Sequence, residues 1–272
     1  MGSPREQRPR PALRMRSALV AVLALLSLLG GPRGASAVGN PSVAARRPLS
    51  VLFVGNSLTY VNDVPALTEA LAASAVVPRR LVVRAVTAGG ATLSAHWRSG
   101  DAVRALREHR PDVLILQGQS TEPLTSASDF SLYAILLKAE ADSVGARTVL
   151  FQTWARPHGD GFYSSPASGG SPVAMQARLN SAYETLARQL DASVARVGEA
   201  FSLVQRESPA ISLLDGTQHA TLAGSYLVAA VVFQSLEGSS PVGATFGAGL
   251  PPSVVTALQA AAATTAARRG GA

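Results

Sequence analysis

The sequence of 272 residues contains no cysteine. This absence excludes a disulfide framework, a thiolate zinc site and a cysteine nucleophile, and it leaves no thiol that could carry a lipid anchor. Charged residues amount to 15% and aromatic residues to 5%, whereas hydrophobic residues make up 47%. A chain of this length and apolar content can bury the core of one α/β domain, while two independent domains would be cramped.

Several patterns typical of cofactor and active sites are also missing. No Gly-x-Gly-x-x-Gly or Walker sequence occurs that could cradle phosphates. No Gly-x-Ser-x-Gly nucleophile turn occurs, which argues against the α/β-hydrolase fold. His158 and Asp160 are two potential metal ligands in a long loop, but two ligands make a poor site. We therefore expect neither a cofactor nor a metal ion.

The formal net charge of +7 is concentrated at the start of the chain. Residues 1–37 contain six arginines and one glutamate, a net charge of +5, and taking this from +7 leaves +2 for the rest. The remaining arginines are scattered, with no basic stripe and no interleaved aromatic residues. The basic composition therefore does not indicate a nucleic-acid partner.

The first 37 residues have the layout of a secretory signal peptide. Five arginines precede an apolar run over residues 18–29, and a Gly-Gly-Pro break follows at residues 30–32. The Ala-Ser-Ala sequence at residues 35–37 is a small-x-small cleavage site. We expect cleavage after Ala37 and a secreted or periplasmic protein without a stable membrane anchor. An uncleaved anchor is the alternative, although the apolar run is short for a bilayer span.

After a linker at residues 38–47, short apolar runs alternate with segments of helical spacing. The expected strands are residues 49–54, 81–86, 113–116, 148–152 and 193–197, and the expected helices are residues 65–73, 101–109, 130–143, 173–190, 222–237 and 253–268. Buried strands that alternate with helices predict a parallel sheet joined by right-handed crossovers. We expect a three-layer α/β/α sandwich with a five-stranded parallel sheet over residues 48–268, followed by a disordered tail at residues 269–272.

In such a sheet, ligands bind outside the carboxyl ends of the strands. Ser57 follows the first expected strand, Gly90 the second and Gln119 the third, while Asp215 and His219 precede the helix that starts at residue 222. Together these positions supply a hydroxyl nucleophile, a base with a nearby carboxylate, and several backbone and amide donors. Acyl transfer needs all of these groups.

Four short blocks in this order resemble the SGNH (GDSL-type) hydrolase family. The blocks are Gly55-Asn56-Ser57-Leu58, Gly90-Ala91-Thr92, Leu116-Gln117-Gly118-Gln119, and the pair Asp215 and His219. The resemblance covers about residues 49–235, and the longer strings at residues 89–93 and 219–227 look like one secreted bacterial branch of the family. It implies a flavodoxin-like SGNH hydrolase fold and the activity of a carboxylic ester hydrolase.

The resemblance also implies a role for each block. Ser57 would be the nucleophile, His219 the base that takes its proton, and Asp215 the group that orients the imidazole. The backbone N–H groups of Ser57 and Gly90, with the side-chain amide of Gln119, would form the oxyanion hole. The alternatives are that Ser57 only caps a helix and that the Gln119 amide only ties two loops together.

Two positions of the site depart from the family's pattern. Asp215 lies four residues before His219, one more than is usual, and Gly216 takes the usual position of the acid. Either Asp215 still reaches the imidazole, or a backbone carbonyl orients the ring and leaves a Ser–His dyad. Gln119 stands where the family usually has Asn and is one methylene longer, but it keeps the amide donor.

These features favour an exported serine esterase that forms an acyl-enzyme at Ser57. By analogy with the family, short-chain esters such as the O-acetyl groups of carbohydrates are the expected substrates, so the partner is a small-molecule or glycan ester. An acyltransferase with the same Ser/His machinery is the second hypothesis. A non-catalytic binding module on the same fold is the third, and the spacing of Asp215 motivates it.

Overall fold

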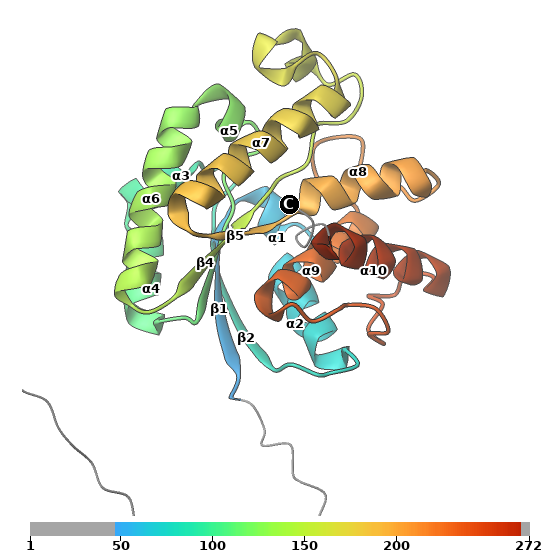
Figure 1. Ribbon diagram of the computed structural model, residues 1–272, viewed down its shortest axis with the longest axis horizontal. Helices are drawn as coiled ribbons and strands as arrows, with labels where there is room; N and C mark the ends of the chain where they lie inside the picture. The colour runs from blue at the N-terminus through green and yellow to red at the C-terminus, as the bar shows by residue number, and fades with distance from the viewer. Residues whose placement is uncertain (1–46, 268–272) are drawn as a thin grey trace, which may run out of the picture. The chain divides into compact units, whose positions relative to one another are not determined.

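In the computed structural model, five short strands form one parallel sheet (Figure 1). The strands are β1 (Leu49–Gly55), β2 (Leu81–Thr87), β3 (Val113–Leu116), β4 (Arg147–Phe151) and β5 (Ser193–Ala195). Their order is β2-β1-β3-β4-β5, and every neighbouring pair is parallel. This is the strand order of flavodoxin-like folds, so the predicted fold class is confirmed.

The middle strands are apolar because helices cover both of their faces. Along β1, Val51 and Phe53 point into one core cluster, and Leu52 and Val54 point into the other. All four residues of β3 are buried, whereas β2 at the edge of the sheet is partly exposed. A strand buried on both faces needs a continuous apolar run rather than an alternating one, which is the pattern that these segments have.

The helices lie in two layers, one on each face of the sheet (Figure 1). One layer contains α2 (Val64–Ser74), α8 (Val197–Glu207), α9 (Leu222–Glu237) and α10 (Pro252–Ala267). The other contains α3 (Leu93–Ser99), α4 (Asp101–His109), α6 (Ala127–Ser143) and α7 (Pro172–Leu190). The short helices α1 (Ser57–Tyr60) and α5 (Glu122–Thr125) directly follow β1 and β3, and the loop after β4 contains two 3-10 turns, η1 (Gly161–Ser164) and η2 (Pro166–Ser168).

The five strands and six helices expected from the sequence are all present, although their ends shift by up to three residues. One residue is assigned to the wrong type of element: Val197, expected at the end of the fifth strand, begins α8. Val197 is apolar and β-branched like the residues of a strand, and the single Arg196 before it is compatible with a strand, so residue type alone does not mark this boundary. Helices α1, α3, α5 and α8 were not expected; α1 and α5 have only four residues each, too few to show a helical period.

The structure describes residues 47–267. The expected signal peptide at residues 1–37, the linker up to residue 46 and the tail at residues 269–272 lie outside the described residues. Within residues 47–267, no helix is long and apolar enough to cross a membrane.

Candidate active site

Ser57 and His219 come together at one edge of the sheet. The Ser57 Oγ lies 3.0 Å from the His219 Nε2, although the two residues are 162 positions apart in the sequence. Ser57 is the first residue of α1, two residues beyond the end of β1, and His219 lies in the loop before α9. A hydroxyl in hydrogen-bond contact with an imidazole is the basic unit of an activated serine nucleophile.

The pair lies where the topology of the sheet favours a ligand site. The chain moves from β1 to β2 on one side of β1 and later to β3 on its other side, so the strand order reverses at β1. In open parallel sheets of this kind, the loops diverge at such a switch point and leave a crevice outside the carboxyl ends of the strands. Ser57 follows β1, and Gln119 follows β3 within three residues of its end.

Asn56 fixes the turn that carries Ser57. Its side-chain oxygen accepts a hydrogen bond from the Leu58 N–H at 3.1 Å and caps α1, and its Nδ2 donates to the Ala91 carbonyl at 3.0 Å. Asn56 is therefore the cap of the short helix, and Ser57 is not. An aspartate at this position could accept at the cap but has no N–H to donate to Ala91. The amide thus joins the Ser57 turn to the segment Gly90-Ala91-Thr92.

Gln117 and His96 hold the same turn in place through hydrogen bonds. The Gln117 Oε1 accepts from the Asn56 N–H at 2.9 Å and from the Thr59 hydroxyl at 3.0 Å. The His96 Nε2 lies 2.7 Å from the Gly55 carbonyl oxygen, and His96 is only 3% exposed. Burial lowers the pKa of His96, which favours the neutral ring. His96 is therefore a structural histidine, which its position after the second strand does not reveal.

Gly90 has a backbone conformation that suits glycine. Its φ is 67°, in the left-handed region, and a Cβ built on it would meet no atom within 4 Å. The conformation, rather than crowding by the protein, is therefore what favours glycine within the described part of the chain. The open space beside Gly90 leaves its backbone accessible, as an oxyanion donor requires. The donor role of Gly90 stays a prediction.

Gln119 is engaged within its own loop. Its Oε1 accepts from the Thr121 N–H at 2.8 Å and from the Glu122 N–H at 3.0 Å, and its Nε2 donates to the Ser120 hydroxyl at 3.3 Å. These contacts stabilise the turn that leads into α5, and all of them lie within one loop, so they do not tie two loops together as the alternative interpretation expects. An amide nitrogen carries two hydrogens, and the bond to Ser120 uses one of them. The predicted oxyanion role depends on the other hydrogen and is not tested by these contacts.

Glu122 connects the second and third blocks through their backbones. Its carboxyl accepts from the Leu93 N–H at 3.1 Å and from the Gln119 N–H at 2.8 Å, and the residue is 3% exposed. Burial raises the pKa of Glu122, and the two backbone donors oppose this shift. A buried carboxyl held by two backbone donors fixes the distance between the loops after β2 and β3.

The loop that carries His219 closes on itself. The Asp215 N–H donates to the His219 carbonyl at 3.1 Å, and the Thr221 N–H donates to the Leu213 carbonyl at 2.9 Å. The Asp215 carboxylate accepts from the Thr217 N–H at 2.9 Å and from the Thr217 hydroxyl at 2.6 Å. The same hydroxyl lies 3.1 Å from the His219 Nδ1. Thr217 thus stands between the acid and the base of the expected triad.

Two contacts tie the His219 loop to the rest of the site. Asn62, in the left-handed region with a φ of 57°, donates from its Nδ2 to the Ala220 carbonyl at 3.1 Å. On the other side, the Trp154 Nε1 donates to the Gln218 carbonyl at 3.0 Å. Trp154 is 2% exposed and stacks on Phe201, with ring centroids 4.4 Å apart. Trp154 is therefore a core residue that positions the His219 loop.

Arg156 joins the long loop after β4 to the two loops at its sides. Its Nη1 donates to the Gln218 Oε1 at 3.1 Å, and its Nη2 donates to the Ser120 hydroxyl at 3.0 Å. Gln218 directly precedes His219, and Ser120 directly follows Gln119. The same guanidinium forms an ion pair of 3.4 Å with Asp160, while His158 is exposed.

Among residues 47–267, no group of three or more potential ligands could hold a metal ion.

Sequence reasoning missed four residues that hold this site together, namely Asn62, Glu122, Arg156 and Thr217. Only Thr217 has a local signal that could have identified it. It follows Asp215 by two residues, and a hydroxyl at this spacing commonly bonds to an aspartate in a turn. The side chains of the other three form hydrogen bonds to backbone groups or to residues that are distant in the sequence. No sequence spacing predicts such contacts.

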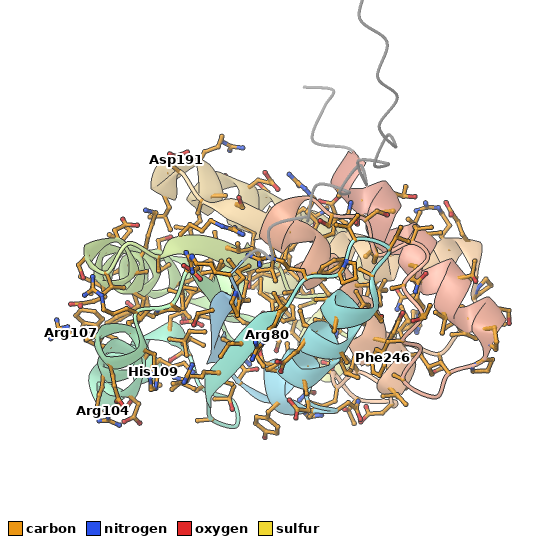
Figure 2. All side chains as sticks on the ribbon, turned by 90° about the horizontal axis from the view of Figure 1, so that it is seen from below. Arg80, Arg104, Arg107, His109, Asp191 and Phe246 are labelled. Carbon is orange, nitrogen blue, oxygen red and sulfur yellow. The ribbon has the colours of Figure 1, made fainter. Side chains whose placement is uncertain are left out.

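Two arginines of α4 are paired with acids. On α4, Arg104 forms an ion pair with Asp101, and Arg107 forms one of 2.7 Å with Glu140. Arg104, Arg107 and His109 gather on one side of the molecule, far from Phe246 (Figure 2). This mixed surface is not the unpaired basic stripe that a nucleic-acid site requires.

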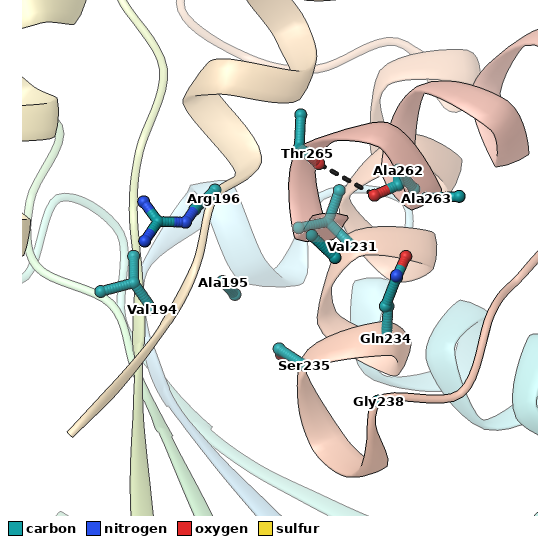
Figure 3. A pocket seen from close by; sticks show the side chains of 11 residues that line it. Val194, Ala195, Arg196, Val231, Gln234, Ser235, Gly238, Ala262, Ala263 and Thr265 are labelled. Carbon is teal, nitrogen blue, oxygen red and sulfur yellow. Dashed lines mark hydrogen bonds between the residues drawn. The ribbon is translucent and has the colours of Figure 1, made fainter. Parts of the chain in front are cut away.

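A cavity of about 290 Å³ lies between β5, α9 and α10 (Figure 3). Its lining includes Arg196, Val231, Gln234 and Ala262. His219 precedes the first turn of α9, whereas Gln234 lies near the last turn of this 16-residue helix. At a rise of 1.5 Å per residue, about 20 Å of helix separates the two ends. The cavity is therefore distinct from the site of Ser57 and His219.

The close contact between the His219 loop and α9 depends on Gly224. A Cβ built on Gly224 would lie 2.2 Å from the Leu213 carbonyl oxygen and 3.0 Å from the Ala220 Cβ. We expect Gly224→Ala to lower the free energy of unfolding by about 1–3 kcal/mol, because the backbone of the loop must move to admit the methyl group. Thermal or urea unfolding measures this change. Gly161→Ala is the control, since a Cβ there meets no atom within 4 Å; equal losses in both variants would contradict the prediction.

Neither a protein-family model nor a curated protein sequence matches this chain. Solved structures do match it. A protein from Slackia heliotrinireducens, provisionally described as an SGNH hydrolase, is 27% identical with a TM-score of 0.58, over 70% of this chain and 99% of that one. A DUF4886 family protein from Bacteroides uniformis is 17% identical with a TM-score of 0.64, over 82% and 96% of the two chains. An acetylxylan esterase from Geobacillus stearothermophilus is 14% identical with a TM-score of 0.53, over 70% and 94%.

Proposed function

We propose that this chain, an SGNH-type hydrolase in its fold, is a serine esterase in which Ser57 forms the acyl-enzyme and His219 is the general base. The observation that carries the proposal is the 3.0 Å contact between the Ser57 Oγ and the His219 Nε2. Helix capping does not explain this contact, because Asn56 is the residue that caps α1. A serine hydroxyl is a weak nucleophile until an adjacent base takes its proton.

In the first half of the reaction, the Ser57 Oγ attacks the carbonyl carbon of the ester while its proton passes to the His219 Nε2. The carbonyl oxygen becomes an oxyanion in the tetrahedral intermediate. We assign its stabilisation to the backbone N–H groups of Ser57 and Gly90 and to the side-chain amide of Gln119. Each such donor contributes about 3–4 kcal/mol to the stability of the transition state. The intermediate then collapses, and the alcohol leaves with the proton from Nε2.

In the second half, a water molecule takes the place of the alcohol. His219 removes a proton from this water, which attacks the acyl-enzyme, and Ser57 regains its proton as the acid departs. If a sugar hydroxyl resolved the acyl-enzyme instead of water, the same residues would catalyse acyl transfer. Product analysis therefore distinguishes hydrolysis from transfer.

We propose short-chain esters, including O-acetyl groups on carbohydrates, as the substrate class. The support is analogy: one of the structures with the same fold is an acetylxylan esterase, and residues 1–37 have the layout of a signal peptide. An exported protein, cleaved after Ala37, would meet polysaccharide esters outside the cell.

A serine-directed phosphonate tests the nucleophile directly. We expect the protein to take up one phosphonate per chain, with loss of activity on p-nitrophenyl acetate, and mass spectrometry to locate the adduct on Ser57. Ser57→Ala should not be labelled, whereas Ser143→Ala, which changes an exposed serine at the end of α6, should be labelled like the wild type.

The proposed substrate class is tested with acetylated xylan, and the release of acetate is the readout.

The possible outcomes separate the three hypotheses. Labelling at Ser57 with release of free acid supports the esterase. Labelling at Ser57 with accumulation of a new ester on a sugar acceptor replaces hydrolysis by acyl transfer. If the wild type is neither labelled nor active, the protein is a binding module and the proposal fails.

A further inference from the structure

Thr217 occupies the position between the acid and the base of the site. Its hydroxyl lies 2.6 Å from the Asp215 Oδ1 and 3.1 Å from the His219 Nδ1. It also accepts from the backbone N–H of His219 at 3.1 Å. In its catalytic consequence, the inference that follows rests on the proposed esterase function.

The protons in this chain of contacts can be assigned from the chemistry of its groups. A threonine hydroxyl has one hydrogen to donate and two lone pairs to accept with. The hydroxyl and the backbone N–H of Thr217 both donate to the carboxylate and hold the pKa of Asp215 below its ordinary value. An ionised carboxylate can only accept, so the single hydroxyl proton of Thr217 points to Asp215.

The remaining contacts then have one consistent arrangement. The Thr217 oxygen has used its proton and can only accept from His219, through the backbone N–H and through the ring Nδ1. The Nδ1 of a neutral ring must therefore carry the hydrogen, which leaves the Nε2 without one. An Nε2 without a hydrogen, 3.0 Å from the Ser57 Oγ, is able to take the proton of the serine.

We propose that Thr217 is a positioning residue that relays the charge of Asp215 to His219 and selects the tautomer in which Nε2 faces Ser57. The acid of this site acts through a hydroxyl rather than by direct contact with the ring. The relay accounts for the additional residue between Asp215 and His219. Residues 215–219 form a closed loop, and this loop leaves room for the Thr217 side chain between the carboxylate and the imidazole. The backbone carbonyl of the dyad alternative is not required.

A pair of substitutions at Thr217 separates its hydroxyl from its shape. Thr217→Val keeps the size and the backbone N–H bond to Asp215, and we expect it to lower kcat about tenfold to a hundredfold with little change in KM. Thr217→Ser restores the hydroxyl and should recover most of the kcat. Thr264→Val is the control, because it removes an exposed hydroxyl that donates to the Ala260 carbonyl within α10. That variant should leave kcat unchanged.

A double-mutant cycle tests the route through Thr217. If Asp215 acts only through this hydroxyl, Asp215→Ala should slow the wild type but have no further effect in Thr217→Val. A further loss in the double variant would show direct action of Asp215 on the ring and would overturn the relay. A wild-type kcat in Thr217→Val, or a Thr217→Ser as slow as Thr217→Val, would overturn it as well.

Nitrogen-15 NMR of labelled histidine reads the tautomer without any substrate. The chain has four histidines, and the signals of His219 are those lost in His219→Gln. We expect a hydrogen on Nδ1 in the wild type and in Thr217→Ser, and a mixture of tautomers in Thr217→Val. A wild type with the hydrogen on Nε2 would overturn the relay. Phosphonate labelling is independent of this readout, so failure of the relay and failure of the esterase proposal remain distinguishable.

Discussion

Replacing Ser57 by alanine is expected to lower kcat for ester hydrolysis by about 10⁴-fold or more, because no other group can form the acyl-enzyme. Donors to the oxyanion and binding of the substrate would leave a small residual rate above that of water. The Ser57 hydroxyl bonds to His219, and its loss removes no core packing, since the side chain is only half-buried. The fold should therefore persist, with a change in unfolding free energy within about 0.5 kcal/mol.

Initial rates on p-nitrophenyl acetate, compared at equal concentrations of folded protein, measure this effect. Ser143→Ala is again the matched control, because it removes an exposed hydroxyl that donates to the Glu140 carbonyl at the other end of the sheet. A Ser57→Ala variant with the rate of the wild type would exclude Ser57 as the nucleophile. Circular dichroism and thermal unfolding exclude the trivial case in which the variant is inactive because it is misfolded.

Replacing His219 by glutamine is expected to have an effect of similar size, about 10⁴-fold in kcat, because an amide cannot take the proton of Ser57. Glutamine keeps polar atoms near the Ser57 and Thr217 hydroxyls, and the backbone N–H of residue 219 still donates to Thr217. The loop should thus keep its shape while the base is lost. Loss of turnover would then report on proton transfer and not on the position of the loop.

The control for this variant is His109→Gln, which changes a histidine at the end of α4, on the side of the molecule that carries Arg104 and Arg107 (Figure 2). It should retain the rate of the wild type. Because Ser57 and His219 act as a unit, the double variant should be no slower than either single variant. Multiplying losses would show that the two side chains contribute separately, which the proposed mechanism does not allow.

The network behind the pair explains why the site is rigid. Asn56, Gln117 and Glu122 connect the loops after β1, β2 and β3 by hydrogen bonds to backbone groups. Asn62 and Trp154 then hold the His219 loop against this frame. Preorganised donors and bases favour the transition state because they need little reorganisation during the reaction. The residues that position the site therefore outnumber those expected to do chemistry.

Much of the site could be predicted because the residues that form it lie at strand ends. Ser57, Gly90 and Gln119 each follow a strand that its apolar run identifies, and parallel strands end at the same edge of the sheet. The order of the blocks then placed His219 opposite Ser57, as the 3.0 Å contact between their side chains now shows. Strand ends are local features, and their convergence follows from topology alone.

The remainder could not be predicted, because it depends on distances between atoms of different loops. The spacing of Asp215 and His219 left direct contact and a backbone carbonyl as the alternatives, whereas the folded loop inserts the Thr217 hydroxyl between them. Val197 likewise has the residue type of a strand, and only the path of the backbone makes it the start of α8. Hydrophobic periodicity carries no information on either point.

The sequence by itself determined the α/β architecture, the edge of the sheet at which the site lies, and Ser57 as the candidate nucleophile, since each depends on local apolar runs and on which residues follow them. The tertiary structure alone decided which groups touch. It made Asn56 the helix cap, buried Trp154 beneath the His219 loop and placed Thr217 between Asp215 and His219. A hydrogen bond forms or fails within a few tenths of an ångström, and that precision arises only when the loops are packed against one another.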